Sequence, residues 1–321
     1  MSANNITLPH QTSDIFLTDG GLETWMIFIE GIDLPEFASF DMLKDDEGLA
    51  TLAKYYRHYV EIAHSHDVGF IFDAPTWRGN PDWAAKIGYD RAALDAANRK
   101  AIRFMQELRV EASVDFSKPM LVNGAIGPRD DGYKPESFMS ADAAQAYHAE
   151  QISSFQAAGT DMVTGLTMTY VNEAVGITRA AQAAGVPVVI SFTTETDGKL
   201  PDGTTLKAAI EATDAATDNG PVYYMINCAH PGHFDHVLEA GEKWVTRIKG
   251  LRANASPMSH AELDEAEELD DGDPEDFGSR YLGIHSKMPH INVIGGCCGT
   301  DHRHIGAVAH ACISHAAIAA E

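Results

Sequence analysis

Short apolar runs alternate with longer stretches of helical spacing along the whole chain, and this pattern repeats eight times in 321 residues. Each run is four to eight residues long and rich in β-branched or aromatic side chains, which is typical of a strand, while the stretches between them have the length and periodicity of helices. The predicted strands are residues 15–18, 68–72, 120–123, 161–165, 187–192, 222–227, 244–251 and 291–294.

Helices are predicted between these strands, among them residues 47–64, 91–111, 141–158, 172–184, 204–217 and 304–319. Parallel strands joined by helical crossovers close most simply into a barrel when there are eight of them. The pattern therefore predicts the α/β class and a single (β/α)8 TIM barrel, in one domain over residues 1–321. We expect the acidic segment at residues 260–278 to be a solvated loop leading into a helix.

Charge excludes one class of partner. The chain has 47 acidic and 23 basic residues and a net charge of −24, which would repel a nucleic-acid backbone. No apolar run is long enough for a membrane span, and the first residues, MSANNITLPH, do not resemble a secretion signal. We expect a cytoplasmic protein whose four cysteines are reduced.

The cysteines fall where a barrel has its active site, at the carboxyl ends of the strands. Cys228 follows the sixth predicted strand, and Cys297 and Cys298 follow the eighth, inside the glycine-rich run GGCCG. Three converging thiolates suit zinc and leave its fourth position open for water or substrate. The alternative is three buried cysteines that act as small apolar residues. Cys312 lies in the last predicted helix, where we expect it to belong to the core.

Five motifs carry a family resemblance: DGGLET near the start, NGAIGP in the third unit, NEA at 172–174, NC at 227–228 and GGCCGT at 295–300. With them the chain resembles the homocysteine S-methyltransferases over nearly its whole length. That family includes the betaine and S-methylmethionine enzymes and the N-terminal module of cobalamin-dependent methionine synthase. Relatives often have a proline shortly after GGCC, where this chain has His302.

The resemblance implies a zinc-dependent enzyme that methylates the thiol of homocysteine, in methionine biosynthesis. It implies that Cys228, Cys297 and Cys298 hold Zn²⁺ at the catalytic centre and that other residues contact the substrates. For homocysteine, we expect Asp19 and Glu173 to contact the ammonium and the N–H groups of Gly20 and Gly21 to contact the carboxylate. For the methyl donor, we expect contacts from Trp77 and Tyr170, with Tyr133 as a further aromatic candidate. Asn227 is expected to orient the loop that carries Cys228. The alternatives are helix-dipole complementarity for Glu173, a turn for Asp19, and simple packing for Tyr133 and Tyr170.

The expected methyl donor is a small sulfonium compound, since no folate or cobalamin module and no extension typical of the betaine enzymes follows the last predicted helix. Betaine, another thiol or selenol acceptor, and a regulatory zinc barrel remain alternatives, and the oligomeric state is open. Two histidine-rich stretches, at 64–67 and 230–236, are assigned no ligand. The first should be a solvated helix end.

Overall fold

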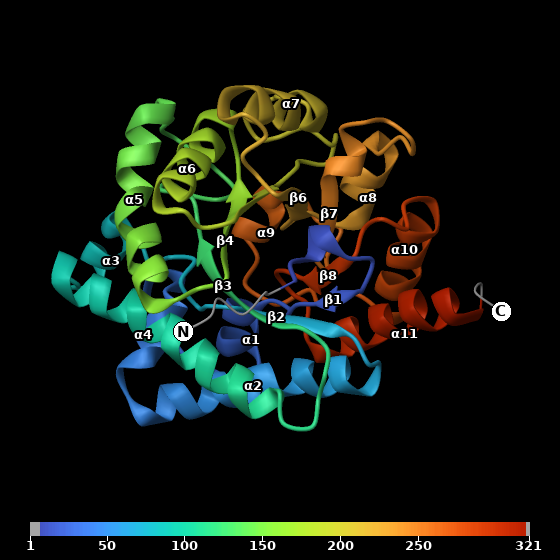
Figure 1. Ribbon diagram of the computed structural model, residues 1–321, viewed down its shortest axis with the longest axis horizontal. Coiled ribbons are helices and arrows are strands. Elements are labelled where there is room, and N and C mark those ends of the chain that lie inside the picture. The colour runs from blue at the N-terminus through green and yellow to red at the C-terminus, as the bar shows by residue number, and fades with distance from the viewer. Residues whose placement is uncertain (1–6, 319–321) are drawn as a thin grey trace.

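The computed structural model describes residues 7–318, and the side chains of residues 7–313. Eight parallel strands form a closed barrel in the order of the sequence, and β1 pairs with both β2 and β8 (Figure 1). The predicted fold class is therefore confirmed, while the extension of one domain over residues 1–321 stays a prediction. The strands are β1 Phe16–Leu17, β2 Gly69–Asp73, β3 Met120–Ile126, β4 Met162–Met168, β5 Val188–Phe192, β6 Tyr223–Asn227, β7 Ile248–Ala253 and β8 Val293–Gly296.

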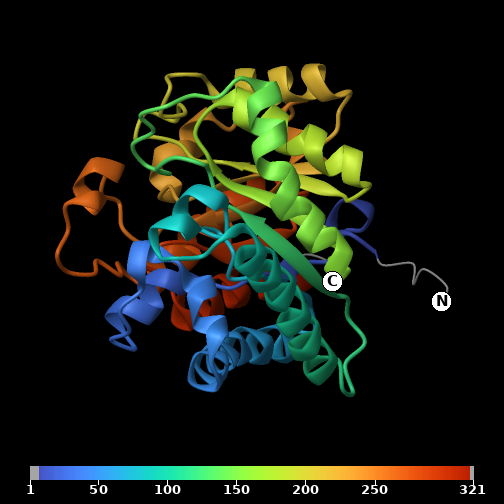
Figure 2. The same ribbon diagram turned by 90° about the vertical axis from the view of Figure 1, so that its left-hand side faces the viewer.

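Helices surround the barrel and carry the chain from one strand to the next (Figures 1 and 2). The connection from β6 to β7 is the exception among the described residues, because it has only a four-residue helix, α8, followed by 3-10 turns. The helices are α1 Leu22–Phe28, α2 Asp46–Ser65, α3 Pro81–Lys86, α4 Arg91–Ala112, α5 Ala141–Ala158, α6 Val171–Ala184, α7 Leu206–Thr217, α8 Pro231–Phe234, α9 His260–Asp264, α10 Pro274–Lys287 and α11 His302–Ile318.

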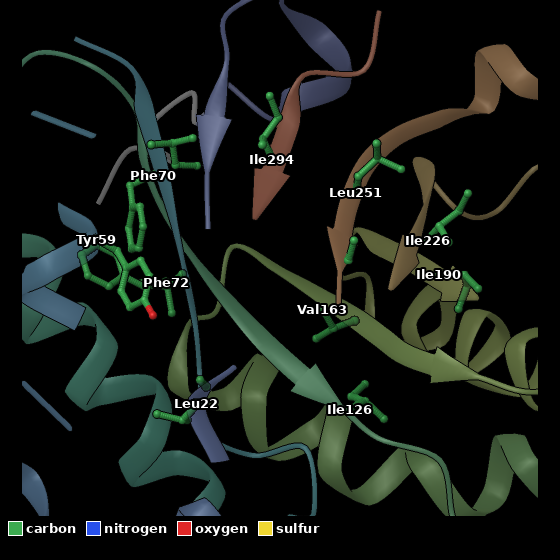
Figure 3. Packing of buried hydrophobic residues seen from close by; sticks show 14 of the residues in the cluster. Leu22, Tyr59, Phe70, Phe72, Ile126, Val163, Ile190, Ile226, Leu251 and Ile294 are labelled. Carbon is green, nitrogen blue, oxygen red and sulfur yellow. The ribbon is translucent and has the colours of Figure 1, made fainter. Parts of the chain in front are cut away.

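The strands are buried on both faces because their side chains alternate between two cores. In β2, Phe70 and Phe72 point outward and pack near Tyr59 of α2, whereas Ile71 belongs to the cluster inside the barrel (Figure 3). The same alternation places Val163, Ile190, Ile226 and Ile294 outside, under the helices (Figure 3). Continuous apolar runs are the sequence pattern that such strands require.

Most strand boundaries differ from the prediction by one or two residues, and three differ by more: the ends of β3 and β4 and the start of β7. β7 begins at Ile248 rather than at 244, since the apolar residues Trp244 and Val245 lie in a buried 3-10 turn. β3 continues to Ile126, through a glycine that looks like a turn residue in the sequence. A Cβ on Gly124 would lie 2.5 Å from the ring of Phe155, so this glycine serves the close packing of α5 on the strand.

The acidic segment at 260–278 is only partly a loop, because it contains α9 and the first turns of α10. The last residue of the predicted helix 304–319 lies outside the described residues. None of the described helices is both long and apolar enough to cross a membrane.

Candidate metal and substrate site

Two neighbouring stretches of the barrel mouth bring three cysteines together. Cys228 directly follows β6, and Cys297 and Cys298 directly follow β8. Their sulfur atoms all lie within 4.8 Å of one another, and they form the one cluster of three or more potential metal ligands among the described residues. The structure thus places the three predicted ligands at one point.

Backbone conformation makes the convergence of adjacent cysteines possible. After β8 the chain turns, so that the N–H of Thr300 donates to the carbonyl of Cys297 at 3.1 Å, and Gly299 has φ +77°. Cys228 itself has φ +54°, which is strained for a residue with a Cβ. The N–H of Cys228 donates to Arg252 O at 3.1 Å and that of Cys297 to Ala253 O at 2.8 Å, so β7 holds both ligand loops.

Cys228 and Cys297 are joined by a disulfide bond, and Cys298 is a free thiol. The expectation that all four cysteines are reduced is therefore wrong for this state. The two half-cystines are 69 residues apart in the sequence and follow β6 and β8, which lie on either side of β7 in the barrel. Because only thiolates bind zinc, this pair must be reduced before it can contribute two ligands.

The donor set fits a zinc ion once it is reduced. Three thiolates at the usual Zn–S distance of about 2.3 Å lie about 3.8 Å apart in tetrahedral geometry, and the observed limit of 4.8 Å is close to that. Burial raises the pKa of the Cys298 thiol, so a bound cation would be needed to keep it deprotonated at neutral pH.

Asn227 lies beside the cluster, and its contacts go beyond the role expected for it. Its Nδ2 group donates to Thr167 Oγ1 at 2.8 Å and points to Cys297 Sγ at 3.9 Å, and its Oδ1 accepts from Thr167 N and Ser191 Oγ. Thr167 has φ +62°, an outlier for a β-branched residue. The side chain of Asn227 thus fixes a strained residue of β4 and contacts the sulfur of Cys297 instead of Cys228.

Tyr133 and His260 brace the cysteines from the other side. Tyr133 Oη donates to Cys298 Sγ at 3.3 Å, and its ring stacks on His260 with 4.2 Å between centroids and 9° between planes. His260 Nε2 lies 2.7 Å from Cys228 O, and His260 Nδ1 lies 3.1 Å from Glu195 Oε1. Burial, and then the neighbouring Cys298, raise the pKa of Tyr133 well above its ordinary value, so it remains protonated.

Glu173, the residue expected to contact a substrate ammonium, is almost completely buried. It follows β4 in the first turn of α6 and is 1% exposed. Its Oε1 accepts from Arg129 N at 2.8 Å and lies 2.9 Å from His148 Nε2, while its Oε2 has no partner. A buried carboxylate oxygen without a donor is costly, so this atom is suited to receive one from a ligand.

Asp19 is already engaged by protein groups. One of its oxygens accepts from Arg252 Nη2 at 2.6 Å and the other from Tyr55 Oη at 3.1 Å, and the same Arg252 is paired with Asp73. A substrate ammonium would have to share this carboxylate. The N–H of Gly21 donates to Thr300 O at 3.0 Å, and a Cβ on either Gly20 or Gly21 would collide with the loop after β8.

The aromatic residues expected around the donor lie on two loops. Arg78 stacks on Trp77 with its guanidinium carbon 4.2 Å from the ring centre, so one face of the indole already has a cation. Tyr170 is buried, and its Oη accepts from Met139 N at 3.0 Å. Glu23 of α1 is a further acidic group near the cysteines, since its charge contributes to the raised pKa of Cys298.

The two histidine-rich stretches stay outside the described cysteine cluster. His64 lies at the end of α2, partly buried, with its ring 4.1 Å from Phe116. His230 caps α8 by accepting from Gly232 N. Cys312 is buried in the core, as expected, and burial raises its pKa to about 12.

Sequence reasoning missed Arg252, His260, His148 and Glu23 as parts of the site. Arg252 carried the clearest signal, because a charged residue directly at the carboxyl end of a barrel strand, and in the inward register, needs a partner. His260 had no local signal. It comes from an acidic stretch that looks solvated in the sequence.

A family model described as homocysteine S-methyltransferase matches residues 16–312. Among solved structures, the chain is similar to homocysteine methyltransferase MmuM from Escherichia coli in its oxidized form, with 21% identity, 94% of this chain and 99% of that chain covered, and a TM-score of 0.72. The metallated form has 21% identity, coverages of 92% and 96% and a TM-score of 0.70. The apo form has 17% identity, coverages of 94% and 96% and a TM-score of 0.64. At these identities the structural likeness supports the fold.

Proposed function

The chain belongs to the homocysteine S-methyltransferase family, and on this premise we propose that it transfers a methyl group from a small sulfonium donor to the thiol of homocysteine, giving methionine. The observation that carries the proposal is the cluster of Cys228, Cys297 and Cys298 at the barrel mouth. A site built of three thiolates suits zinc with one open position.

We propose Cys228, Cys297 and Cys298 as the residues that hold the zinc. When bound there, zinc would keep a fourth sulfur deprotonated at neutral pH, which supplies the thiolate nucleophile. Support for this ligand set comes from the separation of the sulfurs, and from the backbone of β7, which fixes both ligand loops. Reduction of the Cys228–Cys297 bond is a precondition.

We propose that Glu173 binds the ammonium of homocysteine through its unpartnered Oε2. His148 and the N–H of Arg129 hold the other oxygen, so the carboxylate is oriented before the substrate arrives. Asp19, Gly20 and Gly21 remain candidates for the same end of the substrate, although Arg252 and the loop after β8 occupy much of their bonding capacity.

The donor pocket is proposed around Trp77 and Tyr170. A sulfonium would meet a net negative environment, since three thiolates on one zinc ion have a formal charge of −1 and Glu23 lies nearby. Because Arg78 covers one face of Trp77, an onium group would have to contact the opposite face or the edge of the ring. Tyr170 supplies a second aromatic wall, packed edge-on against Phe138.

A donor panel tests this function. The reduced, zinc-loaded protein would be incubated with homocysteine and S-methylmethionine, S-adenosylmethionine, dimethylsulfoniopropionate or betaine, and methionine would be measured. We expect the sulfonium donors to be used in preference to betaine. Higher activity with betaine, or an unchanged donor KM in Trp77→Ala, would contradict the donor pocket, and absence of methionine with every donor would contradict the function.

A further inference from the structure

Two sulfurs of the cysteine cluster receive hydrogen-bond donors from the protein. Tyr133 Oη donates to Cys298 Sγ at 3.3 Å, and Asn227 Nδ2 approaches Cys297 Sγ at 3.9 Å. The shorter contact is also the better defined. Asn254 Nδ2 donates to Tyr133 Oη at 3.3 Å, which occupies a lone pair of that oxygen and leaves its one O–H for the sulfur.

The tyrosine is held in place by two residues of the segment that follows β7, Asn254 and His260. Its ring lies flat on His260, whose two nitrogens contact Cys228 O and Glu195 Oε1. Asn254 belongs to the loop after β7, whereas Tyr133 comes from the loop after β3. These contacts fix the position of the Tyr133 hydroxyl relative to Cys298 Sγ.

A thiol methyltransferase with thiolate ligands has a selectivity problem. Four sulfurs would lie near the electrophilic methyl group, and three of them belong to the protein. The wanted reaction breaks the bond between the donor sulfur and the methyl carbon, leaves the electron pair on the donor as a neutral thioether, and forms a bond to the homocysteine sulfur, whose proton has gone to solvent. The same bond changes at Cys298 would leave a methylated ligand.

We propose that Tyr133 determines which sulfur is methylated: its hydroxyl withdraws charge from the Cys298 thiolate and so directs the methyl group to the substrate sulfur. This inference rests on the proposed function. A hydrogen bond to a charged sulfur stabilises its lone pair and lowers its reactivity, and the bond must be weakened as the sulfur becomes neutral in the transition state. The substrate sulfur, which brings no such donor, stays the better nucleophile.

Tyr133→Phe removes the hydroxyl and keeps the ring that stacks on His260, so steric access to Cys298 is unchanged. The reduced, zinc-loaded variant would be treated with limiting iodoacetamide without homocysteine, and the labelled cysteine identified by peptide mass spectrometry. We expect alkylation of Cys298 about tenfold faster than in the unaltered protein, from loss of one charge-assisted hydrogen bond. Tyr89→Phe, which removes a partly buried hydroxyl bonded to Asp41, is the matched control and should leave the rate unchanged.

A second readout needs no reaction at all. In the cobalt-substituted protein, the sulfur-to-metal charge-transfer band of Tyr133→Phe should move to longer wavelength, since the thiolate has lost a donor. Asn254→Ala should give an intermediate change in both measurements, and it serves if the phenylalanine variant does not fold. Unchanged band and unchanged Cys298 alkylation would overturn the inference. If the unaltered protein makes no methionine with any donor, the proposed function fails, while these two measurements still decide the role of the hydroxyl.

Discussion

At position 173 a buried carboxylate oxygen has no partner, and that single atom makes a prediction about substrate binding. Glu173→Gln should raise the KM for homocysteine by roughly 10- to 100-fold, because a charge-assisted hydrogen bond of about 1.5–3 kcal/mol to the ammonium is lost. Zinc content should not change, since Glu173 contacts His148 and is not part of the cysteine cluster. Steady-state kinetics and metal analysis check both statements.

Glu150→Gln is the control for Glu173→Gln, because it alters an acidic residue of the neighbouring helix α5 that is paired with Arg91 at the surface. It should leave the KM unchanged. An unaltered homocysteine KM in Glu173→Gln would remove this residue from the site.

The three ligand positions make a second residue-scale prediction. Cys298→Ala should lose tight zinc binding and all turnover, because two thiolates are left where three are needed. Cys312→Ala removes a thiol from the core and should retain one zinc per chain. Metal analysis of the reduced proteins decides this, and full occupancy in Cys228→Ala or Cys298→Ala would refute the ligand set.

At the scale of single elements, the start of α11 shows how the chain replaces a proline that relatives often have. Asp301 precedes the helix, and its Oδ1 accepts from Arg303 N at 2.8 Å, as an N-terminal cap does. Burial raises the pKa of Asp301, but hydrogen bonds from His304 and Arg303 outweigh it and hold the pKa well below the ordinary 3.8. Asp301→Ala should therefore lower the free energy of unfolding by about 1–2 kcal/mol at pH 7.

The pH dependence of this deficit has a defined sign. A carboxyl group whose folded pKa is depressed stabilises the protein fully above its unfolded pKa, and this contribution is lost as pH falls towards the folded value. The difference between the unaltered protein and Asp301→Ala should thus be constant from pH 8 to about pH 5 and shrink below about 3.8. Urea unfolding at pH 7 and pH 3 measures it. Asp301→Asn, which can still cap, should recover part of the loss, and an equal deficit at both pH values would contradict the argument.

Element boundaries also show what the sequence could predict and what it could not. All eight strands were predictable because strands buried on both faces form continuous apolar runs. The end of β3 was not, since Gly124 is needed by a ring on α5 that is 31 residues away in the sequence. The short α8 was equally hidden, because it has only four residues and the rest of the stretch before β7 forms 3-10 turns instead of a regular helix.

At the scale of the whole molecule, some parts of the candidate site could be predicted from the sequence and others could not. The cysteines were predictable because each directly follows a strand, and strand ends meet at one mouth. The pairs of Arg252 with Asp19 and Asp73 were not, since they join β7 to the loop after β1 and to β2 across the barrel. These partners are 233 and 179 residues apart, and only the closed sheet brings them together.

The closed barrel leads to a prediction about metal removal. Hydrogen bonds between strands close the ring without help from the cysteine loops. A chelator with a reductant should therefore abolish methyl transfer but leave the far-ultraviolet circular dichroism spectrum unchanged, and zinc should restore the activity. Cooperative unfolding on chelation would show instead that the metal is part of the fold.

Cys228 has a φ of +54°, a conformation that glycine adopts without strain and that costs a residue with a Cβ about 1 kcal/mol or more. At this position glycine would relieve the backbone strain, whereas the proposed metal site requires the thiol of cysteine. In a library evolved in the laboratory for folding alone, Cys228→Gly should become enriched. Glycine should not become enriched at Cys297 or Cys298, because neither has a positive φ. When selection for activity is relaxed, the thiol after β6 should therefore be the first of the three to be lost.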